Sequence, residues 1–172
     1  AKQRVQAGWV QLAFKVAAEM WSFLMTITIQ TSDIITSGTT FTFAAARDSL
    51  YLAEDTVMAS TTASAISGFA GGYGVHIMGE VVAATLGVSL SGGNIAVTVG
   101  ETGSLTSLAD SGGPAALALF GGSNIVNNMG LISGLRTFGG NLSGNNNTVF
   151  NSGTIVSKFT SLILGSAGAT GN

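Results

Sequence analysis

The chain has 172 residues, enough for one domain with a sizeable core. Only 8% of the residues are charged while 46% are apolar, which excludes a disordered chain, since disorder pairs low hydrophobicity with high charge. A net charge of −2 argues against nucleic-acid binding through a basic face, and the absence of cysteine excludes disulfides and thiolate metal sites.

Residues 1–24 differ from the rest of the chain because their apolar residues recur at steps of three and four, which predicts an amphipathic α-helix. Charges such as Lys15 and Glu19 interrupt the apolar run, so we do not expect a membrane span. The helix would cap a repeat stack or dock on a neighbouring subunit. Alternatively, the segment is an upstream extension, because Met25 resembles an initiation site. The apolar positions are Val5, Trp9, Leu12, Val16, Met20 and Phe23, and Trp9 and Trp21 are interpreted as packing anchors.

From Thr26 the apolar period changes to two, which predicts half-buried strands over residues 26–31 and 39–43 with a turn at 36–38. The following segment concentrates acidic residues. Alternation there places Leu50, Leu52 and Val57 on the inner side. The adjacent Glu54 and Asp55 are expected to point to opposite sides or to form a turn.

A repeated segment is the strongest signal in the chain. Residues 124–134 and 147–157 both begin with asparagine and share four further identical residues at corresponding positions, 23 residues apart. A fixed period of this size is typical of stacked repeats. We expect the two asparagines at 128 and 151 to form a side-chain amide ladder, and the two glycines to supply corners with positive φ. The shared residues are Val126 and Val149, Asn128 and Asn151, Gly130 and Gly153, and Ile132 and Ile155.

Weaker copies extend upstream. Four valines serve as landmarks at spacings of 24, 27 and 23 residues, namely Val75, Val99, Val126 and Val149. A second landmark is an apolar residue before glycine, as in Phe120-Gly121, Phe138-Gly139 and Leu164-Gly165. Variation of a few residues per copy is expected where loops leave one corner of a coil.

The period and composition together predict an all-β fold. Twenty-three extended residues cover about 76 Å at roughly 3.3 Å each, which suits one circuit of three short strands. Stacked circuits pair their backbones and share a core that one circuit cannot form alone. Gly, Thr, Asn and β-branched residues disfavour a helical repeat. We therefore predict a right-handed parallel β-helix, or β-solenoid, over residues 25–172, preceded by the α-helix of residues 1–24.

The pattern Asn-x-Val-x-Asn-x-Gly-x-Ile with Gly-Gly turns resembles bacterial secreted repeat proteins: adhesins, autotransporter passengers and haemolysin-type repeats-in-toxin proteins. The resemblance covers about residues 57–172. It implies an extracellular or cell-surface location and allows cell-surface or matrix polysaccharide as a partner. The calcium nonapeptide of the toxin repeats needs an aspartate that the segments 121–124 and 139–142 lack. We expect neither repetitive calcium binding nor another cofactor.

Candidate catalytic residues are few. His76, the single histidine, alternates outward between apolar neighbours, so it is interpreted as a surface residue and a Ser-His-Asp triad is not expected. Glu80 and Glu101 occupy different positions in their repeats and should not stack. The glycine-rich runs at 68–74 and 121–122 lack phosphate-loop residues and are interpreted as turns. One acidic group could cluster near the first coils, formed by Arg47, Asp48, Glu54 and Asp55.

These observations favour a structural protein over an enzyme, with no catalytic, cofactor or metal residues assigned. The segment from Leu164 to Asn172 resembles what precedes each repeat, while the repeat itself is missing. We therefore expect open strand edges and head-to-tail assembly into a filament or surface adhesive structure, with residues 1–24 bracing neighbours. One alternative is a polysaccharide lyase or hydrolase using Asp48, Glu54, Asp55 or Glu80. Another is a fragment of a larger adhesin or toxin.

Overall fold

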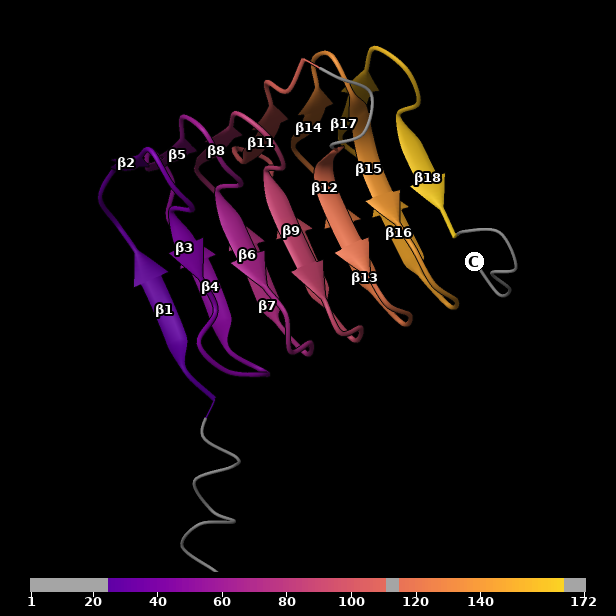
Figure 1. The fold of residues 1–172 in the computed structure, drawn as a ribbon, viewed down its shortest axis with the longest axis horizontal. Coiled ribbons are helices and arrows are strands. Elements are labelled where there is room, and N and C mark those ends of the chain that lie inside the picture. The colour runs from indigo at the N-terminus through magenta and orange to yellow at the C-terminus, as the bar shows by residue number, and fades with distance from the viewer. Residues whose placement is uncertain (1–24, 111–114, 166–172) are drawn as a thin grey trace, which may run out of the picture.

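The computed structural model describes residues 25–110 and 115–165, and both ranges belong to one parallel β-solenoid (Figure 1). Each coil contributes one strand to each of three six-stranded parallel sheets, which we call sheets A, B and C. The predicted all-β solenoid with coils of roughly 23 residues is confirmed. In the described part of the chain no helix is long and apolar enough to cross a membrane. The helix predicted for residues 1–24, with Trp9 and Trp21, lies outside the described residues.

The strands of each sheet follow one another every third strand along the chain. Sheet A contains β1 (Ile27–Gln30), β4 (Ser49–Leu52), β7 (Gly74–Ile77), β10 (Ala96–Val99), β13 (Ile125–Asn128) and β16 (Thr148–Asn151). Sheet B contains β2 (Ile34–Thr36), β5 (Val57–Ser60), β8 (Glu80–Ala83), β11 (Ser104–Ser107), β14 (Leu131–Gly134) and β17 (Thr154–Ser157). Sheet C contains β3 (Phe41–Thr42), β6 (Ile66–Gly68), β9 (Val88–Ser91), β12 (Ala115–Phe120), β15 (Phe138–Leu142) and β18 (Leu162–Leu164).

The core lies inside the three sheets. Successive side chains of a strand point to opposite faces, so alternate residues of every strand face the interior. Leu50 and Leu52 of β4 are fully buried, as predicted, and they stack on Val75 and Ile77 of β7. Equivalent residues of successive coils thus form inner columns, and their outward neighbours form outer columns. We call the bends between sheets the A–B corner, the B–C corner and the C–A corner.

The repeated segment occupies two successive coils in register. Val126 pairs with Val149 in sheet A, and Ile132 pairs with Ile155 in sheet B. The predicted amide ladder is also confirmed, because the Asn128 side-chain nitrogen donates to the Asn151 side-chain oxygen at 2.7 Å. Identical residues therefore stack directly on one another.

The valine landmark is wrong at one position. Val75 and Val126 both pair with Val97, whereas Val99 pairs with Ile77 and Asn128. The physical reason is the A–B corner of that coil, which spans residues 100–103, while the neighbouring corners span only 78–79 and 129–130. Because this corner is two residues longer, the glycines that end the corners still stack on one another. Val99, which precedes the corner, is displaced by two strand positions from the other valines.

The apolar-glycine landmark is also wrong. Phe138 begins β15 and pairs with Ala115, whereas Phe120 ends β12. Leu164 stacks on Leu142, one strand position away from Phe120. Similar dipeptides therefore occur at both ends of sheet C strands for different reasons. Gly121 follows β12 with positive φ, whereas Gly139 lies inside β15, where a Cβ would lie 2.4 Å from the Ser161 carbonyl oxygen.

The role predicted for the stacked glycines needs correction. Gly130 and Gly153 do not have positive φ. They are glycines because the coils approach closely at the A–B corner: a Cβ on Gly130 would lie 2.2 Å from the carbonyl oxygens of Gly100 and Gly103. A Cβ on Gly153 would lie 2.3 Å from the Gly130 oxygen. Close backbone contact, and not backbone handedness, excludes side chains here.

The orientation of Val57 differs from expectation, and the orientation of β1 is set by its pairing. Met58 is fully buried while Val57 is half-buried on the outer face, because Glu54 and Asp55 form a turn that interrupts the alternation. In β1 the side chain of Ile29 faces outward and the side chain of Gln30 faces inward, opposite Leu52. The register with β4, supported by a hydrogen bond from the Thr26 amide to Asp48, fixes this orientation.

Candidate functional site

The two ends of the described solenoid carry its most distinctive surfaces. At the first coil the free edges of the three sheets belong to β1, β2 and β3, and at the last coil to β16, β17 and β18 (Figure 1). These six strands contain no charged residue and no proline. Charges and prolines are the usual devices that block an exposed strand edge. Within residues 25–110 and 115–165, the outer edges of these six strands pair with no other strand, and the strands themselves carry no such protection.

The core is less covered at the last coil than one coil earlier. Val126 and Ile132 are buried, whereas their partners Val149 and Ile155 are half-buried. Leu162, in sheet C, is likewise half-buried. The end of the described solenoid therefore presents part of its apolar interior on all three sheets.

Exposed apolar side chains also gather on the outer faces of the terminal coils. Those of the first coil and its lead-in are Met25, Ile27, Ile29 and Ile35, exposed by 55%, 59%, 64% and 67%. Those of the last coil are Phe150, Val156 and Phe159, exposed by 61%, 46% and 55%. Leu164, exposed by 41%, instead continues the inner column of the fully buried Leu142. Groups of exposed apolar residues mark interaction surfaces more often than single ones do.

The acidic group considered from the sequence does not come together. Asp48 lies before β4 at the C–A corner, while Glu54 and Asp55 follow β4 at the A–B corner. Asp48 is buried and accepts hydrogen bonds from the backbone amides of Thr26 and Ala45, each at 3.0 Å. It therefore holds the first two coils together. Arg47 lies beside Gly72 at the same corner, away from Glu54 and Asp55.

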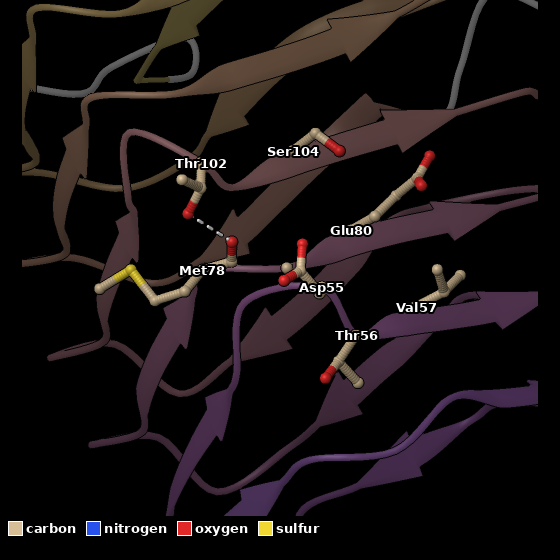
Figure 2. Close-up of a pocket in the computed structure, with 8 residues that line it drawn as sticks. Asp55, Thr56, Val57, Met78, Glu80, Thr102 and Ser104 are labelled. Carbon is tan, nitrogen blue, oxygen red and sulfur yellow. Dashed lines mark hydrogen bonds between the residues drawn. The ribbon is translucent and has the colours of Figure 1, made fainter.

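Asp55 and Glu80 line one shallow hollow at the A–B corner, with a volume of about 310 Å³. They come from neighbouring coils, and in Figure 2 the Glu80 side chain extends away from Asp55. Thr102, on the next coil, donates its hydroxyl to the Met78 carbonyl oxygen at 2.8 Å. The hollow brings two carboxylates into one region, but their side chains do not converge on a common point.

The remaining candidates lie on the surface. His76 is exposed on the outer face of β7, as predicted, with its ring centroid 6.4 Å from that of Tyr51. Glu80 pairs with Ser104, while Glu101 lies in the corner before it, so the two glutamates do not stack. Within residues 25–110 and 115–165, no three His, Asp or Glu side chains are grouped as they would be to hold a metal ion.

Comparison with protein-family models, curated proteins and solved structures finds no match. The fold and the arrangement of its ends are therefore the basis for any functional proposal.

The sequence patterns did not identify the exposed residues of the terminal coils. Ile29 and Phe150 belong to regular alternating segments, so each could face either inward or outward. One feature of the sequence could have indicated these residues: the strands of the first and last coils, such as β1 and β16, lack charged residues. Only the pairing register shows that these apolar residues lie on the outer faces.

Proposed function

We propose that this protein is a non-catalytic structural protein that assembles head-to-tail through the ends of its solenoid into a filament or surface adhesive structure. The observation that carries the proposal is the set of uncharged strand edges, at both ends of the described solenoid, that pair with no other described strand. Exposed strand edges template pairing with another chain unless they are blocked. The charge-poor, cysteine-free composition and the resemblance to bacterial secreted repeat proteins support an extracellular or cell-surface location.

A head-to-tail arrangement follows from the direction of the strands. All neighbouring strands within the three sheets are parallel. Only stacking of the last coil of one copy on the first coil of the next keeps parallel pairing in all three sheets. Such a contact joins two different surfaces, and when it does not close on itself it generates fibres.

Two further features belong to this proposal. The coil is right-handed, because connections between parallel strands of one sheet are right-handed in nearly all proteins. Residues 1–24 brace the junction or a neighbouring copy, because their amphipathic pattern needs a partner for its apolar side. A variant lacking these residues should therefore form shorter or less stable assemblies.

Electron microscopy and analytical ultracentrifugation of the purified protein test the assembly. We expect filaments whose length increases with concentration. Val156→Lys, on an exposed outer position of β17, should shorten them by placing a charge at the edge. The matched control is Thr106→Lys, in the same outer column but in the middle of the solenoid. Monomers alone, across a wide range of salt and protein concentration, would contradict the proposal.

The hollow with Asp55 and Glu80 favours one alternative, a carbohydrate-active enzyme. Glycoside cleavage commonly uses two carboxylates on either side of the scissile bond. The assay is release of reducing ends from acidic polysaccharides, with Asp55→Asn and Glu80→Gln as matched variants. We expect no release from any of the three proteins. Release that both substitutions abolish would establish the enzyme instead.

A further inference from the structure

We infer that the head-to-tail junction continues the register of the solenoid without a shift, so that Ile29 and Ile35 of one copy lie beside Phe150 and Val156 of the next. This inference rests on the proposed head-to-tail assembly and specifies its interface. The occupant of each open end is therefore a second copy of the same chain.

The outer columns support this register. The column of sheet A that begins with Ile29 ends with Phe150, and the column of sheet B that begins with Ile35 ends with Val156. All four of these end residues are exposed. Between the ends, the same columns hold mostly smaller or polar residues: Tyr51, His76, Thr98 and Asn127 in sheet A, and Ala59, Val82, Thr106 and Ser133 in sheet B. Continuation of the columns would bring the exposed apolar ends together and remove them from water.

The inner columns match in the same register. In sheet A, Gln30 begins the column that ends with Asn151, so a carboxamide would meet a carboxamide. In sheet B, Ile34 would meet Ile155, and Thr36 would meet Ser157. In sheet C, Phe41 would meet Leu162, and in sheet A Val149 would meet the methyl group of Thr28.

The amide column gives the junction a direct precedent inside the molecule. Asn128 already donates to Asn151 across one coil boundary, at 2.7 Å. In the assembled stack, Gln30 of the next copy would lie one coil beyond Asn151, and it also carries a side-chain carboxamide. The hydroxyl of Ser157 is buried without a hydrogen-bond partner, and it would face the Thr36 hydroxyl of the next copy. The polar inner residues of one end therefore correspond to polar inner residues of the other.

A shifted register is disfavoured on geometric grounds. A shift by one residue would exchange inward and outward side chains along every strand. The strands of the three sheets run in different directions around the coil. A slide along the strands of one sheet would therefore move the strands of the other two sheets off their partners. All three sheets pair only in the unshifted register.

Disulfide cross-linking tests the register, since the chain has no cysteine of its own. In Ile29→Cys/Phe150→Cys, the two positions of adjoining copies would lie about 4.8 Å apart, within the range for a disulfide. In the control Ile27→Cys/Phe150→Cys, a two-residue offset increases the separation to about 8 Å, which is too far. All three positions are exposed, so these substitutions leave the core intact.

Within one copy the two cysteines are five coil spacings apart, roughly 24 Å, so any disulfide must join two copies. We expect oxidation of the first variant to give a ladder of dimers and larger species on a non-reducing gel, which reduction converts to monomer. The control should stay monomeric on the same gel. In sheet B, Ile35→Cys/Val156→Cys should behave like the first variant, and Ile35→Cys/Thr154→Cys like the control.

The outcomes separate the two proposals. Filaments with the expected cross-links support both. Filaments in which the in-register pairs stay unlinked, or in which the control pairs link equally well, overturn the register and leave the assembly standing. Absence of assembly in the unsubstituted protein and in all four variants overturns the head-to-tail proposal itself.

Discussion

The middle coils of the solenoid and its last two coils are joined by different side-chain contacts. At the A–B corner of sheet A, the inner column holds Leu52, Ile77 and Val99 in the middle coils, all fully buried and apolar. In the last two coils the same column holds Asn128 and Asn151, which are joined by a hydrogen bond.

The C–A corner shows the same change. The position before each sheet A strand is occupied by Tyr73 and Ile95 in the middle, and by Asn124 and Asn147 in the last two coils. Asn124 is fully buried, accepts from the Ile95 amide at 3.1 Å, and donates to the Asn147 side-chain oxygen at 2.9 Å. Asn124 also donates to the Gly121 carbonyl oxygen.

Apolar columns and buried amide pairs differ in the substitutions that they tolerate. An apolar column is stabilised in proportion to the area that it removes from water, and it has no directional requirement. A buried amide pair is directional, and loss of one partner leaves the other unsatisfied at a cost of about 1–3 kcal/mol. The middle should therefore respond to lost volume, and the last two coils to lost hydrogen bonds.

The largest effect is expected for Leu117→Ala in the middle of sheet C. Leu117 is buried, so its truncation should lower the free energy of unfolding by about 3 kcal/mol through lost burial and a cavity. Urea unfolding followed by circular dichroism measures the change. The matched control is Leu162→Ala, in the same inner column but half-buried in the last coil, which should cost about 1 kcal/mol. Equal losses would show that the last coil is as well packed as the middle.

Asn124→Ala should come next, with a loss of about 2 kcal/mol. The substitution leaves the Ile95 amide and the Gly121 carbonyl oxygen without their side-chain partner. Asn127→Ala is the control, because Asn127 points outward from β13 and should change stability by less than about 0.5 kcal/mol. The same unfolding measurement applies. If Asn124→Ala lowers the free energy of unfolding no more than Asn127→Ala does, the amide contacts do not stabilise the fold.

Much of the fold could be predicted because identical residues stack. Val126 on Val149 and Asn128 on Asn151 share both chemistry and spacing, so the period alone gives their pairing. The prediction failed where corner length varies, since the longer corner at 100–103 places Val97, and not Val99, in the valine column. A period-two pattern carries no information about how many residues a corner holds.

The candidate interface was harder to predict for a related reason. Alternation shows that Ile29 and Gln30 face opposite sides, but not which of them faces inward. That choice is made by pairing with β4 and by the buried Asp48 carboxylate, which receives the Thr26 amide. Contacts between residues 22 positions apart therefore decide the surface of the first coil. The buried pair of Asn124 and Asn147 had a visible signal, because both begin their copies of the repeat.

Asn128→Val is expected to change stability by less than about 1 kcal/mol, in contrast to Asn124→Val, which should resemble Asn124→Ala. The side-chain oxygen of Asn128 is buried without a hydrogen-bond partner, so the substitution removes an unsatisfied group together with the hydrogen bonds. The two acceptors, the Asn151 side-chain oxygen and the Thr154 carbonyl oxygen, belong to exposed residues that can bind water instead. Valine also matches Val99 in the preceding coil. A loss as large as that at Asn124 would show that the two amide pairs are equivalent.

A small effect of opposite sign is expected for Val99→Thr, a nearly isosteric change at the residue that pairs with Asn128 in the column. The new hydroxyl can donate to the unpaired side-chain oxygen of Asn128, which should raise the free energy of unfolding by up to about 1 kcal/mol. Whether the free energy of unfolding rises or falls depends on the side-chain oxygen of Asn128 as acceptor. In an Asn128→Val background the hydroxyl would be buried without a partner, so the same substitution should instead cost about 1–3 kcal/mol. A double-mutant cycle measures the difference, and the same sign in both backgrounds would mean that the hydroxyl does not reach Asn128.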